Sequence, residues 1–257
     1  RPAACLCAWM VLLCAGAAAQ SALHISQITD NRNSYAGGQI PRFEKLEISF
    51  QVENTVAKNL QMPYDAATPP GVPPGEGITV NALLTPDNWT TVYIQPAFHY
   101  QEFLDEIRSR REWFYPTNNY AWKVRFAPHL QGTWQYKLLA QDAGGSAESA
   151  ALPFVVTDSA NRGFIRVSQR DSRYFEFMDG TYFPALGYNM NYDHLSWVNP
   201  VLENQTNMQA MSANGIQLIR LWLSQWSIYG SEWNPWNSQD PAEHVNYLPA
   251  TGITFNE

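Results

Sequence analysis

The sequence has 257 residues, a length that fits one or two domains. It is 45% hydrophobic and 14% aromatic, which is enough for a buried core and excludes a chain that is disordered throughout. The 23 acidic residues outnumber the 16 basic ones and give a formal charge of −7. We therefore expect no nucleic-acid partner, because such a partner needs a basic face.

Residues 1–19 are predicted to be a signal peptide. They contain an uncharged, mostly apolar run that ends in Ala17-Ala18-Ala19-Gln20, a small-x-small cleavage pattern. The run has about 15 residues, fewer than the roughly 20 that a membrane span needs; the alternative is a buried N-terminal helix. We expect a secreted or periplasmic protein that has no membrane partner after cleavage. All three cysteines lie in this segment, so no downstream cysteine can form a disulfide or bind a metal.

Residues 20–41 are polar, contain Gly, Ser and Asn, and are predicted to form a flexible leader. In residues 46–52 the apolar residues occupy every second position, which predicts a strand with one face toward solvent. A long loop rich in proline is expected over 54–77. Further strands are expected at 78–84, 91–94, 122–126, 134–138 and 152–156. Short strands separated by turns are typical of an antiparallel β-sandwich.

Residues 101–112 are predicted to form a short helix or a loop. The segment is charged, and its apolar residues have helical spacing. Its acidic residues Glu102, Asp105 and Glu106 could be interpreted as a carboxylate site. A solvated helix face is the simpler interpretation.

The pattern changes after residue 163. An Asp-Gly turn at 179–180 lies between two aromatic segments and is typical of a hairpin. The next expected elements are a strand at 185–191, a helix at 204–214 and a nearly continuous apolar strand at 216–223. Because such an apolar strand is typical of one buried on both faces of a parallel sheet, this succession indicates a βαβ unit that cannot stand alone.

Two groups of motifs resemble known families. Trp122-x-Val-Arg-Phe-x-Pro and Gly132-x-Trp-x-Tyr resemble the N-terminal immunoglobulin-like domain, of unknown function, of bacterial proteins classed as glycoside hydrolases. Gly163-Phe-Ile-Arg-Val, Ala185-Leu-Gly-Tyr-Asn and Gly215-Ile-Gln-Leu-Ile-Arg-Leu-Trp-Leu are similar to the start of a clan A, cellulase-like TIM barrel.

The resemblance implies a mainly β fold in two parts. The first part is an immunoglobulin-like antiparallel β-sandwich over 42–158. The second part, over 163–257, is the first βαβ portion of a truncated (β/α)8 barrel, since a complete barrel takes about 250 residues. In that clan the two catalytic carboxyl groups follow the fourth and seventh barrel strands. We therefore expect the catalytic residues beyond Glu257, and a sequence that is incomplete at both ends.

Substrate-binding residues are expected at the carboxyl ends of the two barrel strands, where barrel enzymes place their sites. By the resemblance, Arg220 would hold the nucleophilic carboxylate ionised; the alternative is a structural ion pair. Asn189 and Asn191 would bond sugar hydroxyls, or serve in a turn or at a helix start. Three tryptophans of the following loop would stack on pyranose rings, or be structural: Trp226, Trp233 and Trp236. We expect no metal and no cofactor.

These observations predict part of a secreted glycoside hydrolase that degrades polysaccharides. The partner would be a polysaccharide or oligosaccharide, and the reaction a hydrolysis of O-glycosyl bonds with retention, which uses two carboxyl groups about 5–5.5 Å apart. One alternative is a noncatalytic carbohydrate-binding protein whose sandwich binds the sugar. Another is a purely structural, cell-surface immunoglobulin-like protein. Polysaccharide binding by residues 40–160 separates these alternatives.

Overall fold

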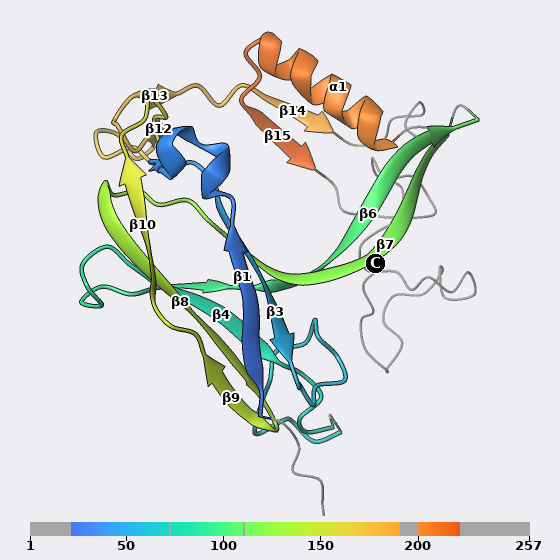
Figure 1. The fold of residues 1–257 in the computed structure, drawn as a ribbon. Helices are drawn as coiled ribbons and strands as arrows, with labels where there is room; N and C mark the ends of the chain where they lie inside the picture. Colours follow the sequence, from blue (N-terminus) through green and yellow to red (C-terminus); the bar gives the residue numbers. More distant parts are fainter. Residues whose placement is uncertain (1–21, 72, 110, 191–199, 222–257) are drawn as a thin grey trace, which may run out of the picture.

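The computed structural model of the protein describes residues 22–221, with 72, 110 and 191–199 left aside (Figure 1). Its first sheet has four antiparallel strands in the order β1 (His24–Asp30), β3 (Leu46–Glu53), β7 (Arg111–Phe126) and β6 (Phe98–Arg108). The second sheet has the order β2 (Ile40–Pro41), β10 (Leu152–Thr157), β8 (Gly132–Asp142), β4 (Thr79–Thr85) and β5 (Tyr93–Pro96), with β9 (Gly145–Glu148) paired to β8. The two sheets pack face to face around one apolar core.

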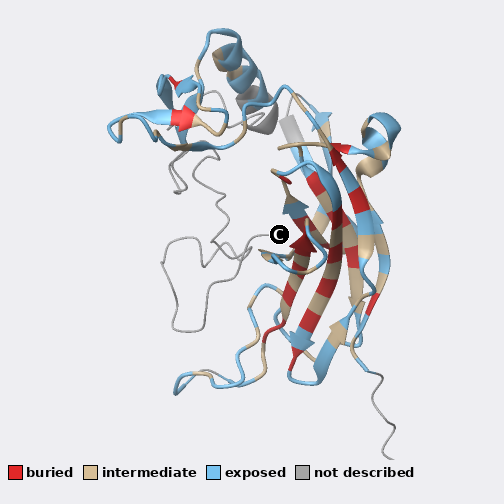
Figure 2. Cartoon of the chain, turned by 90° about the vertical axis from the view of Figure 1, so that its left-hand side faces the viewer, coloured by how far each residue is buried: buried red, intermediate tan, exposed pale blue. Residues whose placement is uncertain are grey.

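Alternating apolar and polar residues build the interface between these two sheets. On β3, Leu46, Ile48 and Phe50 are buried while the residues between them reach the surface. In Figure 2 the buried residues recur along the strands of the sandwich. The strands β3, β4 and β8 therefore each contribute one face to the core, as period-two patterning requires. The prediction of a mainly β chain is confirmed, and the long loop expected over 54–77 contains no strand or helix among its described residues.

The prediction of a flexible leader over 20–41 is wrong for the part that the structure describes. Residues 24–30 form β1, which pairs with β3. Two short 3-10 turns, η1 (Arg32–Ser34) and η2 (Ala36–Gly38), then lead into β2. The sequence pattern does not indicate this strand, because the strand contains a bulge where Gln27 has a φ of 52° and the alternation of side chains is interrupted.

The prediction of a helix or loop over 101–112 is also wrong. Residues 98–108 are β6, which pairs along its length with β7 and forms a long hairpin that extends away from the sandwich (Figure 1). The partner residues 113–115 are Trp-Phe-Tyr, which favour strands. Pairing with them satisfies the backbone groups of both segments, and this outweighs the helical spacing of a few apolar residues.

The proline-rich loop is held to the second sheet by one buried carboxylate. Asp142, at the end of β8, is 3% exposed. Its oxygens accept hydrogen bonds from the Thr55 hydroxyl (2.7 Å), the Val56 N–H (2.9 Å) and the Gly144 N–H (2.7 Å). Burial raises the pKa of Asp142, but these donors outweigh it and hold the pKa below its ordinary value. The carboxylate therefore remains ionised and fixes the start of the loop.

His129 makes the stability of the sandwich depend on pH. Its Nε2 lies 3.3 Å from the Tyr93 hydroxyl, and its ring contacts Trp134. Burial lowers the pKa of His129 below the ordinary 6.5. The unfolded chain therefore binds a proton at higher pH than the folded chain, and stability falls as pH drops below 6.5. We expect His129→Gln to flatten the change in urea midpoint between pH 7.5 and 5.5.

The control for this prediction is His24→Gln, because His24 is exposed at the start of β1. It should keep the pH dependence of the unmodified chain. An equal drop in midpoint for His129→Gln and the unmodified chain would contradict the prediction.

After residue 163 the chain forms two small sheets. The first is antiparallel, with strands β11 (Ile165–Val167), β12 (Phe175–Phe177) and β13 (Tyr182–Phe183). The second has the parallel strands β14 (Gly187–Met190) and β15 (Leu218–Leu221), joined through α1 (Pro200–Ala213). The expected order of strand, helix and strand is thus present, and the Asp-Gly turn at 179–180 lies between β12 and β13 as predicted.

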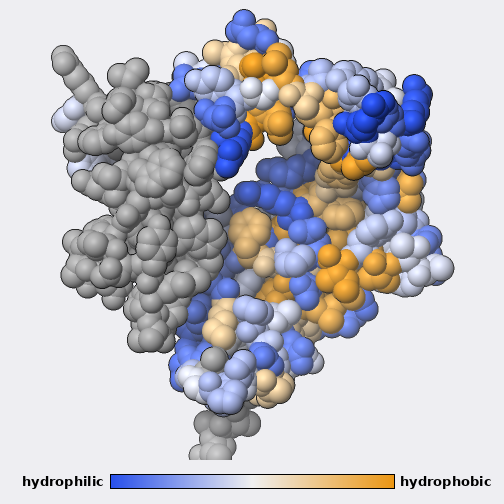
Figure 3. Space-filling view, turned by 180° about the vertical axis from the view of Figure 1, so that it is seen from behind, coloured by the Kyte–Doolittle hydropathy of each residue, from blue (hydrophilic) through white to orange (hydrophobic). Residues whose placement is uncertain are grey.

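The prediction that this region begins a (β/α)8 barrel is wrong. Among the described residues it contains a single helix and no parallel strands besides β14 and β15. Leu218 and Ile219 are 47% and 37% exposed, whereas a barrel strand is covered on both faces. Figure 2 shows the chain after residue 163 as mostly exposed, and Figure 3 shows hydrophobic side chains at its surface. An apolar run predicts a strand, but it does not fix how many neighbours cover that strand.

Candidate functional site

Two of the predicted site residues lie opposite each other. Asn189 on β14 and Arg220 on β15 are paired in the parallel register, so their side chains lie on the same face of the two-stranded sheet. Both are exposed. The sheet thus brings together one amide and one guanidinium, and their role in binding a sugar stays a prediction. The other predicted residues lie outside the described part of the chain: Asn191, Trp226, Trp233 and Trp236.

A second candidate is the distal part of the β6–β7 hairpin. We call residues 103–116 the arm, because they follow a register shift between Gln101 and Phe103 and project beyond the sandwich (Figure 1). The arm has several half-exposed apolar side chains: Leu104, Ile107, Trp113 and Phe114. Exposed apolar side chains on both faces of a two-stranded ribbon are typical of an interaction site.

One face of the arm is an aromatic row. Leu104 lies opposite Tyr115, and Trp113 precedes Tyr115 by two residues, so these three side chains share a face. The rings of Trp113 and Tyr115 are nearly parallel, with an angle of 16° between their planes and 6.4 Å between their centroids. The Trp113 indole N–H donates to the Arg108 carbonyl (3.3 Å), which fixes the ring against the strand. Trp113 nevertheless remains 45% exposed.

Two charged groups, Arg108 and Glu106, lie beside the aromatic row. The Arg108 guanidinium lies 4.8 Å from the centroid of the Tyr115 ring and pairs with the Glu106 carboxylate at 2.6 Å. The carboxylate is therefore held beside the rings, where it can accept hydrogen bonds from hydroxyl groups. Residues 106 and 113 are also directly opposite in the strand register.

The base of the arm is fixed by Glu102. Its Oε2 accepts hydrogen bonds from the Asn119 side-chain amide (2.8 Å) and the Thr117 hydroxyl (3.0 Å). These two bonds, in that order, hold the pKa of Glu102 below its ordinary value. The acidic residues of this segment are therefore on a strand and not on a solvated helix face. Glu102 has a structural role at the register shift, whereas Glu106 lies beside the rings.

Other kinds of site find no support within the described ranges. Across residues 22–221, apart from the gaps given above, no three His, Cys, Asp or Glu side chains are close enough to hold a metal ion. In the same part of the chain, no helix combines the length and the apolar composition that crossing a bilayer requires.

Comparison with known proteins shows a distant similarity to a solved structure. No family model matches the sequence, and no curated protein matches it. Among solved structures the chain is similar to a protein described as a "putative glycoside hydrolase from Bacteroides vulgatus", with 14% identity and a TM-score of 0.45. The match covers 80% of this chain and 34% of that protein, so the chain spans about a third of its length. The immunoglobulin-like family of the sandwich stays a prediction.

Sequence reasoning missed the arm. Trp113, Phe114 and Tyr115 are three consecutive aromatic residues, and that run was the available signal. Because aromatic residues favour strands, this run could have indicated a further strand before the one predicted over 122–126. The charged composition of 101–112 and the helical spacing of its apolar residues favoured a helix instead.

Proposed function

We propose that the chain is the polysaccharide-binding part of a secreted protein related to glycoside hydrolases, and that the arm contacts the polysaccharide. The observation that carries this proposal is the exposed row of Trp113 and Tyr115 with the Glu106 carboxylate beside it. Aromatic rings cover the C–H faces of pyranose rings, while charged and polar groups at their edges bond the hydroxyls.

The shape of the arm also favours a polymer over a small ligand. The aromatic row follows the paired strands of an extended ribbon, so a bound chain would run along the ribbon. The helix α1 contacts β7, and the same helix joins the two strands that carry Asn189 and Arg220. Those two residues would supply further hydrogen bonds to the sugar.

Replacing Trp113 by Ala tests the proposal. We expect the variant to bind a polysaccharide about tenfold more weakly than the unmodified chain, which corresponds to roughly 1.4 kcal/mol, because a large exposed ring surface is lost. Affinity electrophoresis against a panel of plant and microbial polysaccharides finds the ligand. Titration calorimetry with an oligosaccharide of that ligand then measures the change.

The matched control is Tyr182→Ala, which removes another exposed aromatic ring (60% exposed) from β13, outside the arm. It should leave binding unchanged. Equal weakening by both variants would contradict a role for the arm. Binding of no polysaccharide by the unmodified chain would contradict the proposed function and favour a structural cell-surface protein.

A further inference from the structure

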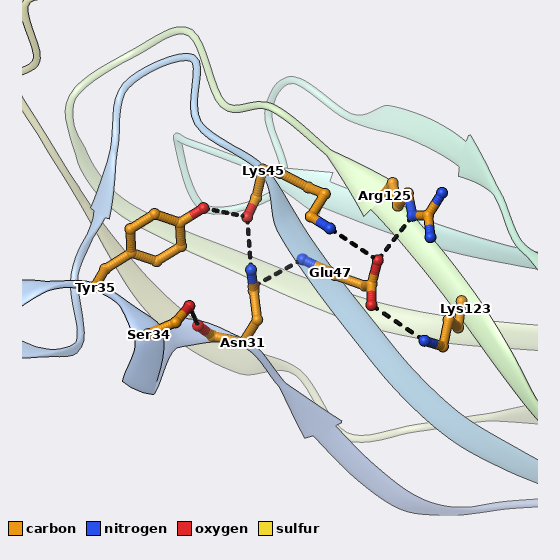
Figure 4. A network of polar contacts seen from close by, with 7 residues as sticks. All are labelled: Asn31, Ser34, Tyr35, Lys45, Glu47, Lys123 and Arg125. Carbon is orange, nitrogen blue, oxygen red and sulfur yellow. Dashed lines mark hydrogen bonds and ion pairs between the residues drawn. The ribbon is translucent and has the colours of Figure 1, made fainter. Parts of the chain in front are cut away.

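A second surface of the sandwich has a positive charge. The Glu47 carboxylate on β3 is surrounded by three cations: the Arg125 Nε lies 2.7 Å away, and the Lys45 and Lys123 Nζ atoms each lie 3.2 Å away (Figure 4). Three cations and one carboxylate sum to a charge of +2, on a chain whose overall formal charge is −7. The cluster is therefore a local exception to the charge of the protein.

The backbone around Glu47 is held in place by the turn that follows β1. The Asn31 side-chain amide and the Tyr35 hydroxyl both donate to the Lys45 carbonyl, at 2.9 and 2.8 Å. The Asn31 side-chain oxygen accepts from the Glu47 N–H at 2.8 Å. Figure 4 shows this network leading from the turn to the three cations. The position of the carboxylate, and with it the positions of the cations, is thus fixed before any ligand binds.

The cations lie on the outer face of the first sheet beside aromatic rings. Glu47 is opposite Arg125 in the strand register, and Phe98 is opposite Lys123, so these side chains point away from the core. The Arg125 guanidinium is 5.1 Å from the centroid of the Phe98 ring, and the Lys123 Nζ is 4.0 Å from that of Tyr100. The outer face of the first sheet therefore carries positive charges and aromatic rings side by side.

Arg125 retains donors that Glu47 does not use. A guanidinium has five N–H donors, and among the described residues the hydrogen bond of Arg125 is the one from its Nε to Glu47. Its side chain is 52% exposed. Burial raises the pKa of Glu47, but the donors of Arg125, Lys45 and Lys123 outweigh it and lower the pKa to about 2. Glu47 thus stays ionised and orients the guanidinium, whose remaining N–H groups suit a carboxylate.

We infer that this outer face, with Arg125, Lys45, Lys123 and Phe98, binds an acidic polysaccharide, and that the polysaccharide of the proposed function contains uronic acid residues. The inference rests on the proposed function. A uronic acid carries a carboxylate for the guanidinium and a pyranose ring for Phe98, so it matches both parts of the surface. The positive charge favours this sugar over a neutral one.

The test compares two matched ligands and two kinds of variant. The ligands are a polygalacturonate oligomer and the same oligomer with its carboxyl groups reduced to hydroxymethyl groups. We expect Arg125→Gln and Lys45→Gln to weaken binding of the acidic oligomer about tenfold and fivefold, and to leave the reduced oligomer unaffected. Arg125→Lys should keep most of the affinity. Trp113→Ala should weaken both ligands equally.

The results test the acidic face and the arm separately. If the reduced oligomer binds as tightly as the acidic one, or if Arg125→Gln leaves acidic binding intact, the inference is overturned while the arm keeps its proposed role. If poly-L-glutamate of equal length binds as tightly as the acidic oligomer, the face recognises charge without sugar and the inference is overturned. If Trp113→Ala changes neither ligand, the proposed role of the arm fails, and loss through Arg125→Gln alone still supports the acidic face.

Discussion

Replacing Trp134 by Ala is expected to unfold the sandwich at a temperature about 10 °C lower than the unmodified chain. Trp134 is fully buried between the two sheets. Its ring contacts Phe126, Phe154 and Tyr93, and its indole N–H donates to the Leu130 carbonyl at 2.9 Å. Truncation of a buried Trp costs about 3–5 kcal/mol, a large share of the roughly 5–15 kcal/mol that stabilises a folded protein.

Thermal denaturation followed by circular dichroism measures this effect. Trp113→Ala is the matched control, because it makes the same substitution at a half-exposed position on the arm. Its unfolding temperature should change by no more than a few degrees. If the two variants had the same unfolding temperature, the prediction that the buried Trp134 ring stabilises the core would be contradicted.

The second large effect is expected for Asp142→Ala. This change removes the acceptor for two backbone N–H groups and one hydroxyl at the start of the proline-rich loop. Because a buried donor without an acceptor costs about 1–3 kcal/mol, the free energy of unfolding should fall by about 3 kcal/mol. Urea denaturation measures the loss, and limited proteolysis should cut the chain faster within residues 54–77.

Two further variants of aspartate make this prediction specific. Asp142→Asn keeps one acceptor oxygen but turns an amide N–H toward a donor, so it should lose a large part of the same stability. Asp158→Ala removes an exposed carboxylate that pairs with Arg42 at 3.1 Å, and should cost less than about 1 kcal/mol. Equal losses at positions 142 and 158 would contradict the anchoring role of Asp142.

The sandwich strands that could be predicted are those with uninterrupted alternation. Residues 46–52 and 78–84 follow the period of two closely, and they form β3 and most of β4. The apolar–polar alternation of the sequence is interrupted where the backbone departs from a regular strand. β1 has its bulge at Gln27, and the arm begins at the register shift after Gln101. Pairing decides both segments, that of β1 with β3 and that of the two strands of the arm with each other, and the pattern of one segment does not reveal its partner.

Of the candidate sites, too, one could be predicted from the sequence and another could not. Asn189 and Arg220 could be placed at one sheet from their positions in a strand–helix–strand succession, and they do lie opposite each other. The cluster around Glu47 could not be found in this way. Lys45 and Glu47 lie at the start of β3, whereas Lys123 and Arg125 lie on β7, and Lys123 follows Glu47 by 76 residues. The pairing of β3 with β7 brings them together.

The path of the chain between β5 and β6 has a mechanical consequence. The backbone leaves β5 of the second sheet at Pro96 and enters β6 of the first sheet at Phe98, and the Ala97 N–H between them bonds the Val80 carbonyl at 2.9 Å. A pull on the arm is therefore passed to both layers, through β6 to the first sheet and through Ala97 to the second.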